Sequence, residues 1–388
     1  MYGVSKRAEV IRPFVVMDVV ARAKELAAAG HDIVRLEIGD PDLPTPAMIT
    51  RAAEAAMESG DTGYTQSAGL PDLRDAISAH YASAYHGVTV DPADIVVTQG
   101  TSPAMLLVFG ALLDPGDEVI ISDPCYPAYP NYVNFLGGVP VPLRVRAEEG
   151  FRYRPEEVRA AITPRTRAIM VNSPCNPTGT VLPPEDLAAL AAIAEETGVW
   201  IVSDEIYHGL DFSGASRSIR EFTDRAFVLN GFSKAYAMTG WRLGYLIAPR
   251  AFVRPAEKIQ QNFFLCANHF VQVAGTVALT EAQGEVAKMR ETYDERRRYL
   301  VPALRDEVGL RIDAEPTGAF YVFADASAWG TDSLDMSRRI LEEAHVSCAP
   351  GVDFGPGGEG FLRFSYATSL DRLREGVSRL AAWGAGHS

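Results

Sequence analysis

Cysteine is scarce in this chain of 388 residues. Its four cysteines, at positions 125, 175, 266 and 348, form no CxxC pair. Widely spaced single cysteines disfavour both a zinc site and a disulfide framework. We therefore expect no bound metal and a reducing, cytoplasmic setting. The opening stretch, 1-MYGVSKRAEVIRPF-14, also lacks the apolar core and small-residue cleavage site of a secretion signal.

Long apolar runs and blocks of positive charge are missing as well. No uncharged apolar run approaches the roughly 18 residues that are needed to span a bilayer, so we expect no contact with a membrane. The formal net charge is −14, and the densest basic cluster is 296-RRR-298, in a charged helical stretch. This cluster is typical of a solvated helix face. Because an acidic protein repels phosphate backbones, we expect small-molecule partners and no nucleic acid.

Two glycine-rich nucleotide motifs are absent too. The chain contains neither GxxxxGK[ST] nor GxGxxG. The first absence excludes a Walker P-loop, and the second counts against a dehydrogenase that transfers hydride. What is present is an ordinary globular composition, 47% hydrophobic and 22% charged. The chain is long enough for two or three domain-sized units.

Helical and strand-like segments alternate through the centre of the sequence. The predicted strands are short continuous runs rich in Val and Ile, at 94–98, 118–122, 167–172, 199–203, 226–230 and 243–248. Such runs favour a mainly parallel sheet that is buried on both faces. The predicted helices lie at 14–30, 70–85, 101–113, 127–137 and 184–198, and a further strand is predicted at 33–39.

The character of the sequence changes near residue 282. A long charged helix is followed there by strand pieces at 319–323 and 361–367, with a helix between them and another at the end. We predict an α/β fold with a three-layer α/β/α large domain and a smaller α+β domain. The predicted division is an N-terminal arm with part of the small domain, the large domain and the small C-terminal domain, at 1–45, 46–281 and 282–388.

Polar residues gather directly after the predicted strands. In a parallel sheet, ligands bind beyond the carboxyl ends of the strands. Five strand ends, far apart in the sequence, supply candidate residues to one rim: Gly100, Thr101, Ser102, Tyr126, Asn176, Asp204, Tyr207, Ser233 and Lys234.

Lys234 has the surroundings of a reactive amine. It follows a strand end and precedes 235-AYAMTG-240, which offers little polar company. Desolvation lowers the pKa of a lysine and makes its amine a nucleophile for carbonyl groups. Arg242 adds a permanent positive charge, and the turn at Gly100 opens a helix, where backbone N–H groups bind a phosphate. A Schiff-base lysine, a phosphate cradle, a buried carboxylate at Asp204 and a stacking aromatic ring are what pyridoxal phosphate requires.

Several of these residues also have ordinary interpretations when each is read alone. Thr101 or Ser102 could be a simple helix N-cap. Asp204 could be an N-cap or a structural ion pair, and Asn176 could serve only the turn 172-NSPCNPTGT-180. Arg363, which alternates within 361-FLRFSYA-367, could face solvent.

Three segments in order resemble the hallmarks of the class I/II aminotransferases, which belong to the aspartate aminotransferase superfamily and to fold type I of the pyridoxal-phosphate enzymes. These segments are 172-NSPCNPTG-179, 203-SDEIYHG-209 and 231-GFSKAYAMTGWRLG-244. The segments 37-EIGDPD-42, 62-TGYTQSAGLPDLRDAI-77 and 361-FLRFSYA-367 also match, so the resemblance covers essentially the whole chain. It implies an enzyme that moves an amino group between an L-amino acid and a 2-oxo acid by a ping-pong, Schiff-base mechanism.

The resemblance also implies a role for each matching residue. Lys234 would bind pyridoxal phosphate covalently and shuttle the proton, and Asp204 would pair with the pyridine nitrogen. Asn176 and Tyr207 would hydrogen-bond the ring oxygen, and Tyr126 would stack on the ring. The phosphate would be held by Thr101, Ser102, Ser233 and Arg242.

Other implied roles concern the substrate and the assembly. Arg363 would bind the substrate α-carboxylate, with the Gly39 backbone nearby. Tyr64 would reach the phosphate of a neighbouring subunit, which implies a homodimer with shared active sites. The resemblance further suggests a cis peptide bond between Asn176 and Pro177.

Some questions stay open on the sequence. Certain dicarboxylate-preferring relatives carry a Lys shortly after the phosphate-turn glycine, whereas this chain reads Gly100-Thr101-Ser102-Pro103. The substrate side chain and the preferred oxo acid are therefore undetermined. A carbon–sulfur β-lyase is the alternative reaction, although Tyr207 favours transamination. A non-catalytic regulator on the same fold is disfavoured, because no spare length for a DNA-binding segment precedes Phe14 and the chain is acidic.

Overall fold

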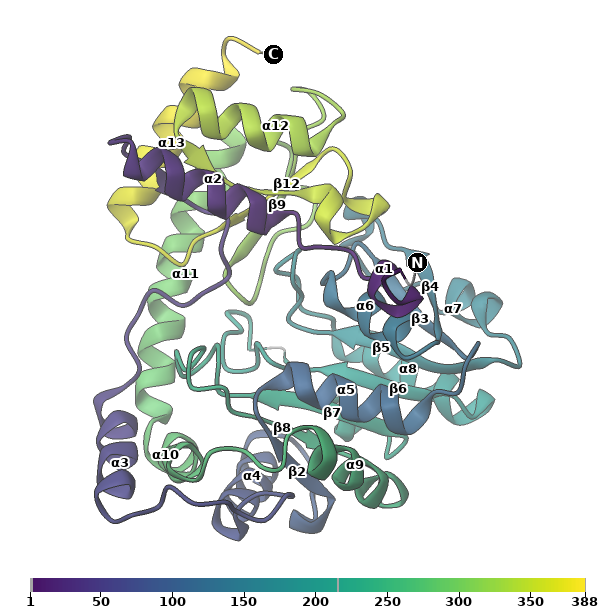
Figure 1. Cartoon of the computed structure of the whole chain (residues 1–388). Helices are drawn as coiled ribbons and strands as arrows, with labels where there is room; N and C mark the ends of the chain where they lie inside the picture. Colours follow the sequence, from purple (N-terminus) through teal and green to yellow (C-terminus); the bar gives the residue numbers. More distant parts are fainter. Residues whose placement is uncertain (1–2, 215, 388) are drawn as a thin grey trace.

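The computed structural model describes residues 3–214 and 216–387, and its centre is a seven-stranded sheet (Figure 1). The strand order is β2-β8-β7-β6-β5-β3-β4. All strands run parallel except β8, which is antiparallel to both of its neighbours. The strands are β2 (Ile95–Thr98), β3 (Glu118–Asp123), β4 (Val139–Arg144), β5 (Thr166–Asn172), β6 (Trp200–Asp204), β7 (Ala226–Gly231) and β8 (Gly244–Ile247).

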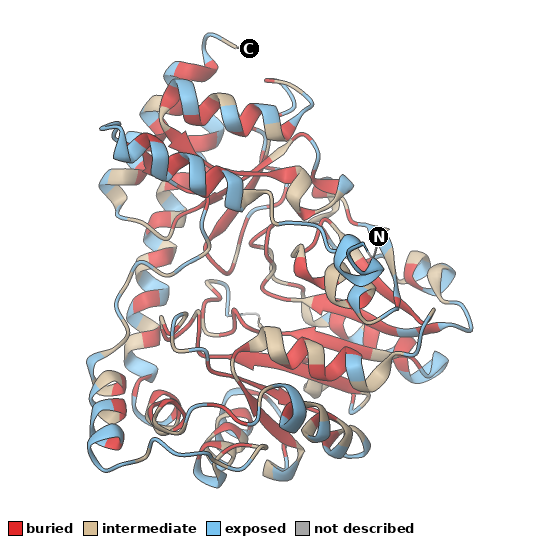
Figure 2. Ribbon diagram, viewed as in Figure 1, coloured by how far each residue is buried: buried red, intermediate tan, exposed pale blue. Residues whose placement is uncertain are grey.

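Successive side chains of these strands pack against helices on opposite faces of the sheet, which is why the strand runs are continuously apolar. In β2, Ile95 and Val97 belong to the core beneath α4, α8 and α10, whereas Val96 belongs to the core beneath α5, α6 and α9. The sheet is buried between these two helical layers (Figure 2). The predicted three-layer α/β/α architecture is confirmed.

The helices predicted at 70–85, 101–113, 127–137 and 184–198 are present within two residues of those bounds, whereas four further helices of this part of the chain were not predicted. Most of the eight begin at a proline or directly after one, as expected for the first turn of a helix. The bounds are α3 (Ala47–Glu58), α4 (Pro71–Ala84), α5 (Thr101–Leu112), α6 (Ala128–Phe135), α7 (Pro155–Ala161), α8 (Pro184–Thr197), α9 (Arg250–Phe263) and α10 (His269–Glu281).

A smaller α+β unit lies above the sheet in Figure 1. Its antiparallel sheet has the order β11-β12-β9, and a short parallel pair joins β1 to β10. The strands are β1 (Val34–Arg35), β9 (Tyr321–Asp325), β10 (Val346–Ser347), β11 (Ala349–Pro350) and β12 (Phe361–Ser365). The helices of this unit are α2 (Val16–Ala28), α11 (Gln283–Asp306), α12 (Ser333–Arg339) and α13 (Leu370–Gly384), whereas α1 (Lys6–Glu9), at the N-terminus, lies beside α6 of the large unit.

The first and last parts of the chain meet in this unit, because β1 near the N-terminus pairs with β10 near the C-terminus. The predicted division at residues 45/46 and 281/282 stays a prediction; α3 begins at Ala47 and α11 at Gln283. Among the residues that the structure describes, no helix is long and apolar enough to cross a membrane.

Two local predictions differ from the structure. The predicted strand 33–39 is a strand only at Val34–Arg35. Beyond Leu36 the backbone leaves the sheet, because the carbonyl groups of Glu37 and Gly39 accept hydrogen bonds from Arg363 and Lys234. The edge strand β4 was not predicted, since Pro140 and Pro142 lie within it, and proline disfavours strands away from a sheet edge.

Candidate active site

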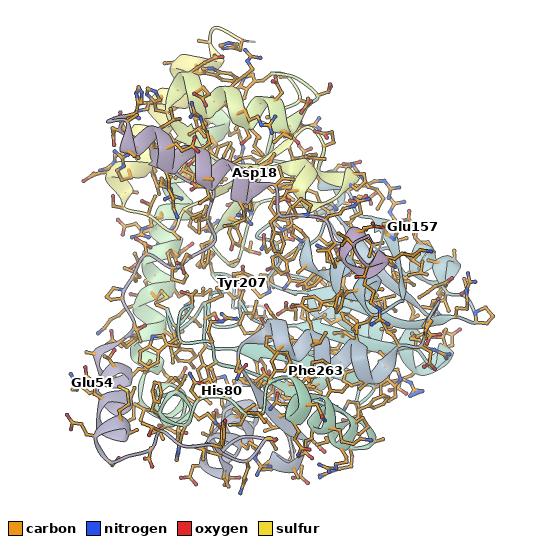
Figure 3. All side chains as sticks on the ribbon, in the orientation of Figure 1. Asp18, Glu54, His80, Glu157, Tyr207 and Phe263 are labelled. Carbon is orange, nitrogen blue, oxygen red and sulfur yellow. The ribbon has the colours of Figure 1, made fainter. Side chains whose placement is uncertain are left out.

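A cavity of about 490 Å3 lies at the carboxyl rim of the large sheet, below the small unit. Eleven of the twelve predicted site residues line it. They are Gly39, Thr101, Ser102, Tyr126, Asn176, Asp204, Tyr207, Ser233, Lys234, Arg242 and Arg363. Tyr207 lies in the middle of the molecule, below the helix that carries Asp18 (Figure 3). The fold therefore brings together side chains from strands that are far apart in the sequence.

Lys234 is half-buried at the floor of this cavity. Its Nζ donates a hydrogen bond to the Gly39 carbonyl oxygen at 2.6 Å. Burial lowers the pKa of Lys234 to about 8, and the charge of Asp40 partly opposes that shift. Much more of this amine is therefore neutral near physiological pH than for an ordinary surface lysine, and the neutral amine is the nucleophile.

Asp204 ends β6 and is 3% exposed. Tyr129 donates its hydroxyl proton to Oδ2 at 2.9 Å, and the Ile206 N–H donates to Oδ1 at 3.2 Å. Burial raises the pKa of Asp204 to about 6. This carboxylate has no cationic hydrogen-bond partner among the described residues, so a cation brought into the cavity would compensate its desolvation.

The turn before α5 places backbone N–H groups at the start of a helix, an arrangement suited to an anion. Gly100 adopts a φ of 99°, and the first N–H groups of α5 follow it. No side chain caps α5, so the simple N-cap interpretation of Thr101 or Ser102 is wrong. A Cβ at Gly100 would lie 2.5 Å from Nη2 of Arg242, so only glycine allows the guanidinium to approach the turn.

Arg363 on β12 is 5% exposed, so the prediction that it lies in the site is supported and a solvent-facing position is excluded. Its Nη1 donates to Asn176 Oδ1 at 2.8 Å, and its Nη2 donates to the Glu37 carbonyl at 2.6 Å. The guanidinium lies over the rings of Tyr321 and Phe354, with its Cζ 4.4 and 4.8 Å from their centroids. Within the described residues its Nε is buried without a hydrogen-bond partner. The planar fork is thus held in place with donor capacity left for an anion.

Tyr207 and Tyr321 form a second fixed pair. Their hydroxyl groups lie 2.8 Å apart. Burial raises the pKa of Tyr207 well above its ordinary value, so this hydroxyl stays protonated. A Cβ at Gly39 would overlap the Tyr321 hydroxyl. Glycine at position 39 is therefore required for the tyrosine pair and the Lys234 contact to coexist.

Sequence reasoning missed several residues of the cavity. Tyr129 follows Tyr126 by three residues, one helical turn, and that spacing was the available signal. For Tyr321, the sequence indicates only that the residue lies in a strand, and nothing in it points to the cavity. Phe14, at the start of an apolar wall formed with Val16, Met17 and Val20, stacks on Tyr126 with ring centroids 5.9 Å apart.

The backbone of the neighbouring loop also agrees with the sequence. The predicted cis peptide bond at Asn176–Pro177 is present. Two further cis peptide bonds, at Asp123–Pro124 and Ser173–Pro174, were not predicted.

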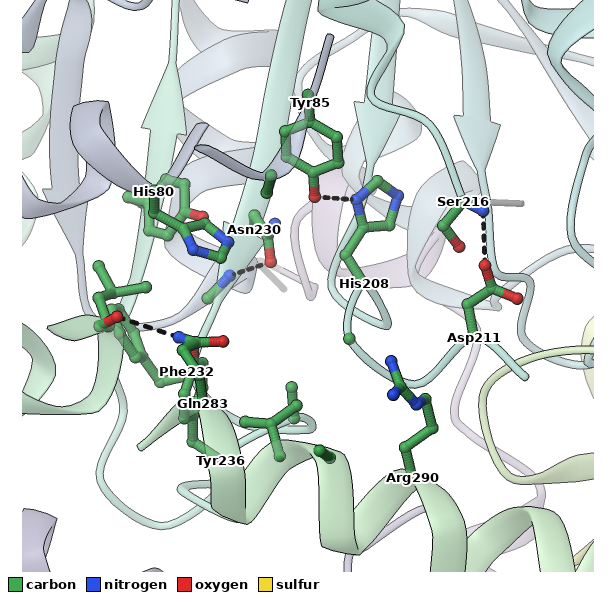
Figure 4. Close-up of a pocket in the computed structure, with 18 of the residues that line it drawn as sticks. His80, Tyr85, His208, Asp211, Ser216, Asn230, Phe232, Tyr236, Gln283 and Arg290 are labelled. Carbon is green, nitrogen blue, oxygen red and sulfur yellow. Dashed lines mark hydrogen bonds between the residues drawn. The ribbon is translucent and has the colours of Figure 1, made fainter. Parts of the chain in front are cut away.

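A second cavity of about 400 Å3 is lined by residues on either side of Lys234 in the sequence, among them Phe232, Ala235 and Tyr236 (Figure 4). Ser233 and Lys234, which lie between them in the sequence, line the first cavity. His208 fixes this region: its Nδ1 lies 2.5 Å from the Tyr85 hydroxyl, and its Nε2 lies 3.0 Å from the Ser173 carbonyl. None of the predicted site residues lines this cavity. One of its polar groups contacts the Lys234 segment, because Gln283 Nε2 donates a hydrogen bond to the Tyr236 hydroxyl at 3.0 Å.

Among the twelve residues to which the resemblance gives a role, Tyr64 is the one outside the site cavity. It is 84% exposed. Its neighbour Thr65 packs against the segment before α10, with its N–H donating to Cys266 Sγ at 3.4 Å. The predicted contact of Tyr64 with a neighbouring subunit stays a prediction.

A lysine amine with a lowered pKa at the carboxyl rim of a mainly parallel α/β sheet is suited to an enzyme that acts on carbonyl groups. Residues 31–380 match the family described as aminotransferase class I and II. The chain belongs to this family and is an aminotransferase, as its motifs predicted.

Individual relatives agree with this assignment. The chain is 40% identical to the aspartate/prephenate aminotransferase of Thermus thermophilus, over 98% of each chain. It is 39% identical to the valine–pyruvate aminotransferase of Mycobacterium tuberculosis, over 96% of each chain. The structure of aspartate aminotransferase from Thermus thermophilus with maleate superposes with a TM-score of 0.94 at 41% identity, covering 98% of this chain and 100% of that one.

Proposed function

We propose that this aminotransferase holds pyridoxal 5′-phosphate in the cavity and transfers an amino group between an L-amino acid and a 2-oxo acid. The observation that carries the proposal is the grouping of Lys234, Asp204 and the Gly100 turn around one cavity. When bound, pyridoxal phosphate withdraws electrons from the substrate α-carbon and stores the amino group between the two half-reactions.

The residues fit this cofactor. The N–H groups at the start of α5, the hydroxyl groups of Thr101, Ser102 and Ser233, and the Arg242 guanidinium supply the donors that a phosphate requires. Asp204 supplies a buried carboxylate for the ring nitrogen. Tyr126 offers an aromatic face, and Asn176 and Tyr207 offer side-chain donors for the ring oxygen.

Each group then has a defined task. The neutral Lys234 amine would hold the cofactor covalently, and once released it would accept the proton of the substrate α-carbon and pass it to the cofactor, as transamination requires. Asp204 would favour the protonated form of the ring nitrogen through its negative charge. Arg363 binds the substrate α-carboxylate through its planar fork, and the Glu37 and Asn176 oxygens orient that fork.

Assembly and location are part of the proposal. Tyr64 is exposed, and the turn on which it lies would enter the site of a second copy, so we propose a homodimer with shared sites. Free cysteines support a reducing cytoplasm. The relatives are named for aspartate, prephenate and valine–pyruvate, so their names do not indicate one substrate for this chain.

The test is a half-reaction on the purified holoenzyme. Each amino acid is added alone, without an oxo acid, while the absorbance of lysine-bound cofactor and the free oxo acid are followed. We expect the absorbance to be lost as about one equivalent of oxo acid forms per site. Lys234→Ala should fold, bind the cofactor without the covalent link, and lose at least about 10³-fold in rate, because its general base is missing.

Two outcomes would contradict the assignment. Continuous release of oxo acid and ammonia, with the absorbance restored, would mean elimination of the kind that a β-lyase performs. An undiminished rate in Lys234→Ala would remove the lysine from the mechanism. Lys258→Ala, which removes an exposed lysine of α9 outside the cavity, is the matched control and should leave the rate unchanged.

A further inference from the structure

The part of the cavity nearest the N-terminus is lined by apolar side chains. Phe14, Val16, Met17 and Val20 come from the first turns of α2 and the residues before it, and Ile38 also lines the cavity. Met17 is 56% exposed and Ile38 is 40% exposed. Large apolar side chains that remain this accessible at a cavity gain most when an apolar ligand group covers them.

The cations of the cavity already have partners or assigned tasks. Among the described residues that line it, the cationic side chains are Lys234, Arg242 and Arg363. Lys234 contacts Gly39, and Arg242 donates to the Thr239 carbonyl at 3.0 Å and lies against the phosphate turn. Arg363 is the cation that binds the substrate α-carboxylate in the proposed function. A second carboxylate, on the substrate side chain, would therefore enter without a cation of its own.

Acidic residues lie in the cavity lining and near the N-terminal segment. Asp40 lines the cavity, and its charge reaches both Lys234 and Tyr321. Asp353 binds the backbone N–H groups of Val15 and Val16 and lies within the electrostatic reach of Asp18. Glu37 also lines the cavity, but its carboxylate is bound by Arg35 and Ser347. A negatively charged side chain would thus meet like charges as well as an apolar wall, and an unpaired charge is costly in such a place.

A second copy of the chain would not supply the missing cation. The turn that carries Tyr64 packs against the segment around Cys266, so both would approach a neighbouring site together. Residues 52–73 and 259–287 contain no Lys or Arg. The titratable base in these segments is His269, whose Nε2 lies 3.7 Å from Asp61.

We propose that this site takes L-amino acids with uncharged, apolar side chains, together with the matching 2-oxo acids, and discriminates against dicarboxylates. The proposal rests on the aminotransferase reaction proposed above, because Arg363 must hold the α-carboxylate for the substrate side chain to reach Met17 and Ile38. One site serves both half-reactions of a ping-pong cycle, so the same preference applies to the amino donor and to the oxo acid acceptor.

The experiment measures kcat/KM of the holoenzyme for leucine, phenylalanine, aspartate, glutamate and lysine in the half-reaction. Leucine or phenylalanine should exceed both dicarboxylates by at least about tenfold, since a site without a matching cation rejects a charged group. A value for aspartate, glutamate or lysine that equals or exceeds the best apolar donor would overturn this inference alone. Formation of no oxo acid from any donor would overturn the proposed function and the inference with it.

A pair of variants tests whether the apolar wall sets the preference. Met17→Arg introduces a cation into the cavity, and it should raise the ratio of kcat/KM for aspartate over leucine by at least about tenfold. Val139→Arg introduces an arginine at an exposed apolar position of β4, outside the cavity and outside both segments that would approach a neighbouring site, and should leave the ratio unchanged. An equal ratio in the two variants would show that Met17 does not face the substrate side chain.

Discussion

Lys234 shows how a single side chain acquires its chemistry from its position. Its amine is desolvated between Gly39 and the ring of Phe320, whose centroid lies 5.9 Å from Nζ. The charges of Arg242 and Arg363 act in the same direction as burial, and those of Asp40 and Asp204 act against it. The result is a lysine with a pKa of about 8, against 10.5 for the free side chain.

This position predicts the pH dependence of cofactor attachment. Because the pKa is lowered to about 8, the neutral amine is half-populated near that pH, whereas less than about 1% of an ordinary lysine is neutral there. The rate at which the apo-protein links pyridoxal phosphate should therefore rise with pH and level off above about 8. Stopped-flow absorbance from neutral pH to the pKa of free lysine measures it.

A variant and a second ligand make this test specific. Asp40→Asn removes the charge that holds the pKa up, so the inflection should move to lower pH. Pyridoxal, which lacks the phosphate, should give a pH–rate curve with the same inflection. This result would show that the inflection comes from titration of Lys234 and not from titration of the phosphate group. An inflection near 10.5 in the wild type would contradict the assignment.

Individual residues divide clearly into those that the sequence could predict and those that it could not. Lys234, Asp204 and Asn176 lie in motifs at strand ends, where local order and sheet geometry bring them together. Tyr321 and Glu37 contribute through the small unit, and only tertiary packing places the Tyr321 hydroxyl against Tyr207. Contacts between parts of the chain more than 100 residues apart leave no local pattern.

At the scale of elements, Asp353 attaches the N-terminal segment to the small unit. Its Oδ1 accepts the Val15 N–H at 2.8 Å, and its Oδ2 accepts the Val16 N–H at 3.2 Å. These bonds fix the residues that start α2, and with them Phe14 and Met17 at the cavity. The helix has no side-chain cap of its own from Val15, so a distant aspartate satisfies its first N–H groups.

We predict that Asp353→Ala releases this segment. Hydrogen bonds to a charged group contribute about 1.5–3 kcal/mol, so exchange of the Val15 and Val16 amides should speed up roughly 10- to 100-fold. KM for the amino acid should rise more than kcat falls, because the wall beside the substrate loosens while Lys234 and Asp204 stay in place. Amide exchange and steady-state kinetics measure the two effects.

Another aspartate of the small unit provides the control. Asp332→Ala removes a carboxylate that caps α12 through the N–H groups of Leu334 and Asp335. It should leave the Val15 and Val16 amides protected. Unchanged protection in Asp353→Ala would show that the segment is held by its apolar contacts alone.

Element boundaries were predictable where periodicity and breakers agree, as for the helix that ends before Gly30. The orientation of β8 was not predictable, because an apolar run of four residues looks the same in either direction. The edge strand β4 was hidden by its prolines, which an edge position tolerates. In each case the deciding factor is the neighbouring strand, which the local sequence does not specify.

At the scale of the whole molecule, exposed apolar side chains gather on the segments near Tyr64. Phe263 is 70% exposed and Leu265 is 51% exposed. Cys266, next to Leu265, receives the Thr65 N–H, which places these residues on the same side as the turn of Tyr64. Exposed apolar groups in such a cluster favour contact with another chain.

We predict a homodimer of twice the 42.1 kDa chain mass, held partly by this cluster. Phe263→Glu should shift the protein toward monomers in analytical ultracentrifugation and lower its activity most at low protein concentration, because each site would lose the partner's turn. Phe135→Glu, the same change at another exposed phenylalanine, should leave the mass unchanged. A monomeric, fully active wild type would contradict the shared site.

The pairing of the first segment of the chain with the last has a consequence for how the enzyme is made. During synthesis, the segments that form β2 to β8, with Asp204 and Lys234, leave the ribosome before the segment that forms β12 has been translated. Residues 34–39 are also synthesised early, and their partners in the small unit come much later. The half of the site that suits a cofactor can thus assemble during synthesis, but the clamp of Arg363 on the Glu37 carbonyl closes only after residue 363 has been added. A nascent chain would therefore be able to bind pyridoxal phosphate before it could bind the carboxylate of a substrate. An incompletely translated chain would then not act on free amino acids.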